Sequence, residues 1–308
     1  MSRELPTGTQ WEIRHGAQHA VVVEVGAALR EYAVDDRPVL DGFPSDRMPD
    51  GGRGQPLLPW PNRLADGQYQ FGGLSLQVPI DEVGRNNASH GLTRWLNWRL
   101  ASHTDSRVEL ELIVHPRPGY PFTLGLTLTY SLSDEGLTVH TRARNLGAEP
   151  LPFGAGQHPY FTVGTPTVDT AVLHVSAQAR LEFDAERRLP TGRSLPVAGT
   201  EFDFQTPRAI GATVLDDCFT DLAADRDGLV HVSLSAQDGE RHVDVWMKNP
   251  YTYVQVFTGD TIAPERRRQG LAIEPMTCPP NAFRTGTHVI TIEPEAAVEL
   301  EWGASPTI

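Results

Sequence analysis

The sequence predicts an all-β protein, on three observations. Apolar residues recur at a spacing of two, clusters of turn-forming residues separate these runs, and no helical periodicity holds for three turns. The clearest run is 107–114, where Val108, Leu110 and Leu112 alternate with charged residues. Because successive side chains of a strand point to opposite faces, each such run predicts a strand with one buried and one wetter side.

The same alternation predicts further strands at 124–132, 137–144, 229–236, 242–247, 253–257 and 297–302. Turn signals lie at 133–136, 237–240 and 259–260, and the longest irregular stretches, 41–63, 83–93 and 258–269, are interpreted as loops. Many strands joined by short turns indicate stacked antiparallel sheets or a barrel. With no fixed-period repeat and no low-complexity linker, residues 1–308 are expected to form a single domain.

Composition restricts the class of partner. The 308 residues are 39% hydrophobic and 21% charged, with a formal net charge of −13. A protein that grips phosphate backbones needs a positive surface, so nucleic acid is not an expected partner, and the run 266–268 of three arginines is interpreted as a solvated loop.

Hydrophobic runs and cysteine spacing predict the cellular location and the metal content. No apolar run approaches the roughly 20 residues that span a bilayer, and the first nine residues carry no apolar signal segment. Cys218 and Cys278 have neither the number nor the spacing of a disulfide framework or a zinc site. The expectation is a cytoplasmic protein without membrane contact and without bound metal.

Two residues could carry acid–base chemistry. His158 precedes a proline and two aromatic residues. It could act in acid–base catalysis, or it could be a structural histidine held by hydrogen bonds. Glu274 ends an apolar stretch, where an unpaired carboxylate is expensive to bury, and it is either catalytic or ion-paired. Taken singly, Arg63 and Asp217 are interpreted as salt-bridge or surface charges and His90 as a loop residue.

Taken in order, five motifs resemble the aldose 1-epimerase (galactose mutarotase) family over about residues 9–302: Asn62-Arg63, His90-Gly91, His158-Pro159-Tyr160-Phe161, Asp216-Asp217 and Glu274-Pro275. The resemblance implies a large antiparallel β-sandwich and an isomerase that interconverts the α and β anomers of a hexose. The expected partner is a small sugar substrate, no cofactor is needed for this chemistry, and the protein is expected to be a monomer or homodimer. Glu274 would be the general base and His158 the general acid, and the sugar-binding residues would be Asn62, Arg63, His90, Tyr160 and Asp217.

These residue types suit ring opening. A base removes the proton of the anomeric hydroxyl while an acid protonates the ring oxygen, and each is worth about 10²–10⁴-fold in rate. With usual pKa values of about 4.3 for Glu and about 6.5 for His, Glu274 is expected to be ionised and to raise the pKa of His158. Trp60, Tyr160 and Phe161 are candidates for an apolar platform under the sugar, with core packing as the alternative for Phe161.

Three other functions stay open. An epimerase of an anionic aldose, such as a hexose 6-phosphate or a sulfonated sugar, would use convergent cations, for which Arg53, Arg85 and Arg94 are available. A non-catalytic carbohydrate-binding protein would need no acid–base pair. A glycosidase or lyase needs paired carboxylates, and Asp216 and Asp217, adjacent on a strand, would point to opposite faces.

Overall fold

The computed structural model describes residues 4–307, and almost all of its regular structure is β, as the alternating pattern predicts. The largest sheet has nine strands joined by antiparallel pairing. In spatial order they are β10 (Arg99–His103), β11 (Arg107–Val114), β12 (Leu124–Ser133), β13 (Gly136–Asn145), β27 (Ala297–Thr307), β23 (His242–Met247), β22 (Val230–Ser235), β17 (Val172–Val175) and β20 (Arg208–Ala209).

A second sheet of eight strands carries the residues considered below. Its spatial order is β19 (Pro190–Pro196), β18 (Ala177–Phe183), β21 (Asp216–Leu222), β24 (Tyr253–Phe257), β25 (Leu271–Met276), β15 (Gly156–Gln157) and β5 (Pro56–Leu57), with β16 (Tyr160–Phe161) also paired to β25.

Smaller elements complete the fold. A four-stranded sheet consists of β1 (Gln10–His15), β2 (Gln18–Val23), β3 (Leu29–Val34) and β4 (Arg37–Pro38). Three two-stranded pairs are β14 (Leu151–Phe153) with β26 (Ile290–Ile292), β6 (Arg63–Ala65) with β9 (Asn87–Ser89), and β7 (Gln68–Phe71) with β8 (Leu74–Gln77). The helical turns are η1 (Val83–Arg85), η2 (Val168–Thr170), η3 (Pro264–Arg266) and α1 (Ala282–Thr285).

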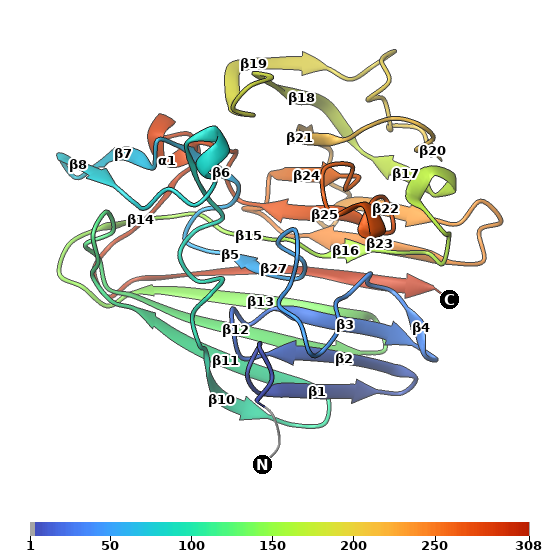
Figure 1. The fold of residues 1–308 in the computed structure, drawn as a ribbon, viewed down its shortest axis with the longest axis horizontal. Helices are drawn as coiled ribbons and strands as arrows, with labels where there is room; N and C mark the ends of the chain where they lie inside the picture. The colour runs from blue at the N-terminus through green and yellow to red at the C-terminus, as the bar shows by residue number, and fades with distance from the viewer. Residues whose placement is uncertain (1–3, 308) are drawn as a thin grey trace.

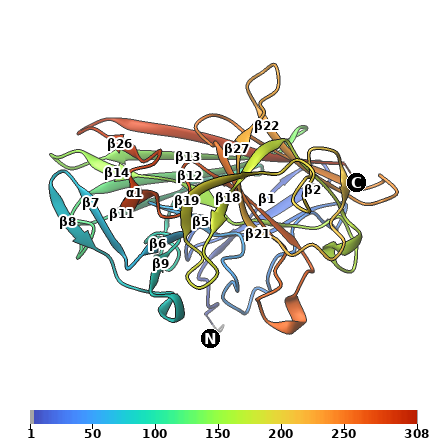
Figure 2. The same cartoon turned by 90° about the horizontal axis from the view of Figure 1, so that it is seen from above.

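The sheets form two layers, and most of the buried apolar residues belong to one large cluster. The nine-stranded sheet is the back layer in Figure 1, and Figure 2 shows it from above, with the N-terminal and the eight-stranded sheets on its other side. One cluster of buried residues includes members of all three sheets, among them Val22, Leu110 and Val256. Burying apolar side chains between facing sheets is the main stabilising term of such a sandwich.

The alternating segments are strands, and the expected loops contain short strands as well. Residues 41–63 include β5 and the first residue of β6, and residues 83–93 include η1 and β9. Strand β27 continues to Thr307 rather than ending at residue 302, since its last residues pair with β23. The sequence hides this extension because Gly303 interrupts the alternation, at a position where a Cβ atom would lie 2.3 Å from the ring of Trp246.

None of the helices within residues 4–307 is long and apolar enough to cross a membrane.

Candidate active site

The floor of the site is the outer face of the eight-stranded sheet. On β25, Ile273 belongs to the hydrophobic core, so the next residue, Glu274, faces the opposite side. Glu274 pairs in register with Gln255 of β24. Gln255 donates a hydrogen bond from Nε2 to Oδ1 of Asp216 on β21, at 2.7 Å. Strand alternation thus brings two carboxylates and an amide to one face.

His158 lies against Glu274. Its Nε2 is 3.2 Å from Oε1 of Glu274, and the two side chains are only 6% and 2% exposed. The imidazole stacks on the ring of Tyr160, with centroids 5.0 Å apart and planes 12° from parallel. Gly52 passes so close that a Cβ there would lie 2.8 Å from the His158 ring, and its φ of +76° also favours glycine. The histidine is therefore clamped beside the carboxylate.

Burial disfavours the charged form of both members of this pair. Together with the positive charges of Arg53 and Arg94, it lowers the pKa of His158 to about 3. Burial and the negative charge of Asp216 raise the pKa of Glu274 well above its usual value. The expectation that an ionised Glu274 raises the pKa of His158 is therefore wrong for the free protein. Both shifts favour the neutral forms, a protonated Glu274 beside an uncharged His158.

Asn62, Arg63 and His90 come together on one wall, as the motifs predict. Arg63 of β6 donates from Nε to both carboxylate oxygens of Glu82, at 3.0 and 3.1 Å, and its Nη1 lies 4.0 Å from Oδ2 of Asp216. The Nδ1 atom of His90 accepts a hydrogen bond from the backbone N–H of Asn62, at 3.1 Å. Burial lowers the pKa of His90 well below its usual value, so its ring is neutral and carries its proton on Nε2.

Asp217 does not reach this site, whereas its neighbour does. Leu215 and Phe219, two residues to either side of Asp217, belong to the hydrophobic core, so Asp217 faces between the sheets. There it forms an ion pair with Arg180, at 2.8 Å. Asp216 faces the other side and lines the cavity. The sequence shows that adjacent residues of a strand face opposite sides, but not which of the two faces the cavity. The prediction that Asp217 binds the sugar is therefore corrected to Asp216.

Asp216 is held by a hairpin that the sequence analysis did not single out. Arg188, in the turn between β18 and β19, donates from Nε to Oδ2 of Asp216 at 3.2 Å and from Nη2 to the Asp216 carbonyl oxygen. The neighbouring Arg187 donates to the carbonyl oxygens of Arg85 and Asn86, at 3.0 and 2.7 Å. Two consecutive arginines thus connect this turn to Asp216 and to the backbone of residues 85 and 86. No short motif marks them, because their partners are about 30 and 100 residues away.

The three predicted platform aromatics do not offer a free ring face. Trp60 is 2% exposed and packs on Phe283, with ring centroids 5.4 Å apart. Tyr160, 1% exposed, lies behind His158 and donates a hydrogen bond to the Gly51 carbonyl oxygen, at 2.9 Å. Phe161 is fully buried in the core, as the alternative prediction of core packing has it. The aromatic residues that line the cavity are Trp95 and Phe257.

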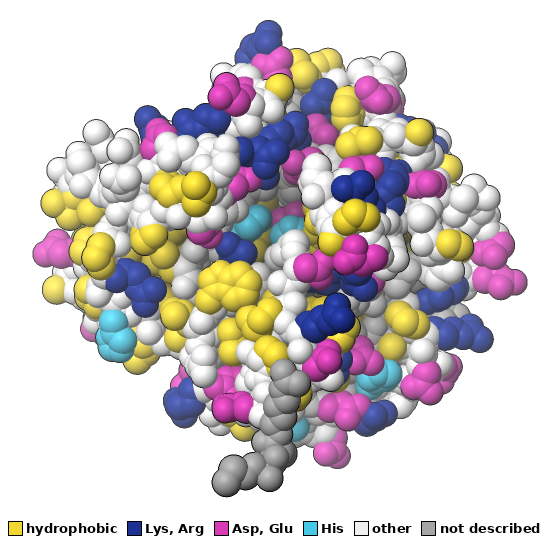
Figure 3. All heavy atoms as spheres, in the orientation of Figure 1, with side chains coloured by type: hydrophobic (Ala, Val, Ile, Leu, Met, Phe, Trp, Pro, Cys, Tyr) yellow, Lys and Arg dark blue, Asp and Glu magenta, His cyan; other side chains and the backbone are white. Residues whose placement is uncertain are grey.

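The site encloses a cavity of about 480 Å³. Its lining includes His158, Glu274, Asp216, Arg63, His90 and Asn62. Figure 3 shows it as a hollow near the centre of one face, with histidine side chains visible inside and hydrophobic side chains along its lower rim. Its size falls in the range of small-molecule sites, about 300–1,000 Å³.

The three arginines that could serve an anionic substrate are already paired. Arg85 contacts Glu82 and Arg94 contacts Asp81, each at 2.9 Å. Arg53 is 1% exposed, forms ion pairs with Asp41 and Asp50, and lies over the ring of Tyr160 rather than lining the cavity. Across residues 4–307, no three His, Cys, Asp or Glu side chains are grouped so that they could hold a metal ion.

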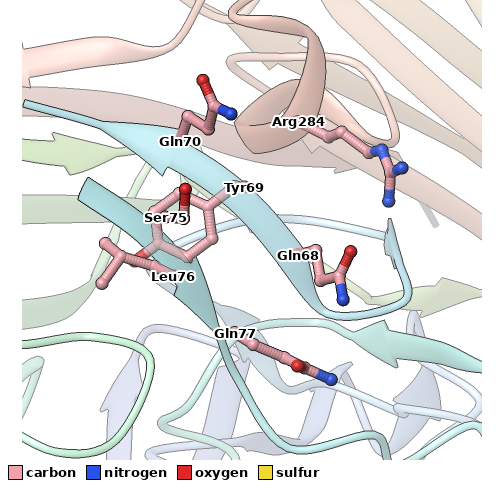
Figure 4. Close-up of a pocket in the computed structure, with 7 residues that line it drawn as sticks. All are labelled: Gln68, Tyr69, Gln70, Ser75, Leu76, Gln77 and Arg284. Carbon is pink, nitrogen blue, oxygen red and sulfur yellow. The ribbon is translucent and has the colours of Figure 1, made fainter. Parts of the chain in front are cut away.

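A second hollow, of about 470 Å³, lies on the β7–β8 hairpin beside α1. Its lining is Gln68, Tyr69, Gln70, Ser75, Leu76, Gln77 and Arg284. In Figure 4 the glutamine amides point in different directions and do not converge on one point. Its titratable side chains, among the residues just named, are a tyrosine and an arginine.

Comparison with known proteins identifies the family. The family model for aldose 1-epimerase matches residues 9–302. Protein YihR of Escherichia coli K12 is 32% identical over 288 residues, covering 93% of this chain and 90% of that protein. A maltose epimerase of Levilactobacillus brevis is 27% identical, covering 70% of this chain and 68% of that one.

Among solved structures, a GalM/aldose epimerase homologue from C. elegans superimposes with a TM-score of 0.85 at 17% identity, covering 96% of this chain and 98% of that one. The fold is therefore that of the galactose mutarotase-like proteins. The chain belongs to the aldose 1-epimerase family. It is an isomerase that acts on sugars.

Proposed function

We propose that this protein interconverts the α and β anomers of a neutral hexose, with Glu274 and His158 as its acid–base pair. The observation that carries the proposal is the 3.2 Å contact between Oε1 of Glu274 and Nε2 of His158 at the bottom of a sugar-sized cavity. A carboxyl group and an imidazole whose pKa values are shifted in opposite directions by burial are typical of a functional site.

The proton of the pair accounts for ring opening without any other proton source. When a sugar binds, the proton of Glu274 passes to Nε2 of His158 across their contact. Glu274 then accepts the proton of the anomeric hydroxyl while His158 donates its proton to the ring oxygen, and the C1–O5 bond breaks. The pair returns to its resting protonation, with a neutral aldehyde bound beside it.

Rotation about the C1–C2 bond presents the other face of the aldehyde, and the same transfers run in reverse. The hydroxyl on C5 returns its proton to His158 and attacks C1, and Glu274 protonates the carbonyl oxygen. Atoms and charge balance over the cycle. In ring opening the sugar gains a proton at the ring oxygen and loses one from the anomeric hydroxyl, and ring closure reverses both transfers.

The cavity walls supply groups that suit the sugar hydroxyls. Arg63 is a fixed donor, the Nε2–H of neutral His90 is a second, and the carboxylate of Asp216 is an acceptor. We assign sugar binding to these three and to Asn62. Tyr160, one of the expected binding residues, is proposed to support the imidazole of His158 from behind.

A neutral sugar is favoured over an anionic one by the charge balance of the cavity. Arg63 and Arg85 share the carboxylate of Glu82, Arg94 is paired with Asp81, and each of these contacts is within 3.1 Å. An anionic group would need cations that are not already paired, because displacing a carboxylate partner costs its hydrogen bonds.

Anomer exchange tests the proposal. Freshly dissolved α-anomers of glucose, galactose and xylose, with glucose 6-phosphate and 6-sulfonated glucose as anionic comparisons, are followed by polarimetry or NMR with and without protein. We expect acceleration of at least one neutral aldose and its loss in Glu274→Gln. Binding of sugars without any acceleration would contradict the proposal and support a carbohydrate-binding protein, and acceleration confined to the anionic sugars would contradict the neutral substrate.

A further inference from the structure

Trp95 stands out among the cavity residues because it is a large aromatic side chain that is largely exposed. It is 54% exposed, whereas Glu274 and His158 are 2% and 5% exposed. All three line the same cavity. The reacting pair therefore lies at the bottom of the cavity and Trp95 at its mouth. A large aromatic side chain left exposed beside a pocket is a common mark of a binding surface.

Two contacts attach Trp95 to the cavity wall. It lies in a turn closed by the backbone hydrogen bond from Leu96 N to the Thr93 carbonyl oxygen, at 3.2 Å. The guanidinium of Arg94 lies 5.4 Å from the centre of its ring. Arg94 is held in turn by Asp81 and by the Ser89 carbonyl oxygen, at 2.9 and 3.0 Å. The indole is thus attached to the cavity wall while much of its surface remains open.

The reaction itself dictates which part of a longer sugar would reach Trp95. Only the reducing-end ring has a hemiacetal carbon, so that ring must lie against Glu274 and His158. Any further ring is directed away from the floor and toward the mouth. The C–H faces of a pyranose are apolar and can cover an indole. The side chains of Asp81 and Arg85, which are 43% and 39% exposed, also line the cavity and can bind hydroxyls.

We infer that Trp95 forms an outer subsite that holds the second ring of a reducing disaccharide while the first ring is at the catalytic pair. The inference rests on the proposed function and names the substrate class for the same cavity. Trp95 is then a specificity residue: it binds a ring that takes no part in the chemistry, and it contributes to disaccharides and not to monosaccharides.

Steady-state anomer exchange on matched sugars tests this inference. The pairs are glucose with maltose, and galactose with its 4-linked disaccharide galactobiose, assayed with wild type and with Trp95→Ala and Trp95→Phe. Trp95→Ala removes the apolar contact between the indole and the second sugar ring, which is comparable in area to burying one side chain. We therefore expect kcat/KM for the disaccharides to fall by about ten- to a hundredfold, mainly through KM. We expect kcat/KM for the monosaccharides to change by less than about twofold.

Two further variants separate a stacking role from a general effect. Trp95→Phe keeps an aromatic face and is expected to retain most of the disaccharide activity. Leu74→Ala, at a residue of β8 that is 49% exposed and outside the cavity lining, is the control for losing an exposed apolar side chain.

The outcomes separate the inference from the proposed function. A wild type that converts monosaccharides but no disaccharide overturns the outer subsite and leaves the proposed function standing. An equal loss on both classes in Trp95→Ala, or no loss on either, also overturns it. A folded wild type that accelerates none of these sugars removes the proposed function, and the inference with it.

Discussion

Two hollows on the surface of this molecule have nearly the same volume, about 480 and 470 Å³, yet their side chains differ in chemistry. The hollow on β7–β8 presents glutamine amides and one serine hydroxyl that face solvent (Figure 4). The cavity on the eight-stranded sheet has a buried carboxyl and imidazole in contact. Exposed amides keep their bulk-water properties, whereas burial shifts pKa values, so a site is defined by what it desolvates and not by its size.

The largest expected effect is loss of the buried pair. Glu274→Gln and His158→Gln each keep the shape of the side chain but remove its proton transfer, so we expect kcat to fall by about 10²–10⁴-fold. Polarimetric or NMR anomer exchange measures the loss, and circular dichroism checks that the variants are folded. Undiminished rates in both variants would remove the pair from the mechanism.

The next effect separates the two adjacent aspartates. Asp216→Ala removes a charged hydrogen-bond acceptor from the cavity, and we expect kcat/KM to fall by about ten- to a hundredfold. Asp217→Ala leaves Arg180 without its partner, so we expect near-normal catalysis and a free energy of unfolding lowered by about 1–3 kcal/mol. Catalytic loss in Asp217→Ala without loss of stability would contradict the assignment of faces.

A smaller effect appears in the pH profile. As pH rises through the raised pKa of Glu274 the pair loses its only proton and kcat/KM falls; as pH falls toward the His158 pKa of about 3 the pair gains a second proton and kcat/KM falls again. The profile is therefore bell-shaped. Its basic limb reports Glu274.

Two variants should move that basic limb in opposite directions. Asp216 raises the pKa of Glu274, so Asp216→Asn should shift the limb to lower pH. Arg188→Met removes a positive partner of Asp216 while Arg63 remains 4.0 Å from it, so the limb should shift to higher pH. A limb that stays in place in both variants would show that Asp216 does not influence the pair.

The smallest effect is expected in the second hollow. Gln70→Ala changes an exposed amide with no buried partner, so anomer exchange and stability should stay within about twofold and about 0.5 kcal/mol of wild type. Enzyme assay and thermal unfolding check both. A substantial loss of activity would mean that this hollow takes part in sugar handling and that the comparison above is wrong.

Sequence reasoning was most accurate where structure is local. Strands such as β11, β12 and β23 were predicted because alternation of apolar and polar residues is a property of neighbouring positions. It missed β5 and β9, which have only two and three residues and form because distant partners are available for pairing. The motifs brought Arg63, His90, His158 and Glu274 forward, but no local signal marked Arg188, and Trp95 was overlooked although it lies five residues after His90.

By itself, the sequence determined the class of fold, the family and the residue types able to open a sugar ring, because periodicity and ordered motifs can be read along the chain. Only the tertiary structure decided that Asp216 rather than Asp217 enters the cavity, that Trp60 is buried while Trp95 is exposed, and that burial raises the pKa of Glu274 and lowers the pKa of His158. Each of these depends on which face of a sheet is covered and how much water reaches a group, and both are set by contacts between segments far apart in the chain.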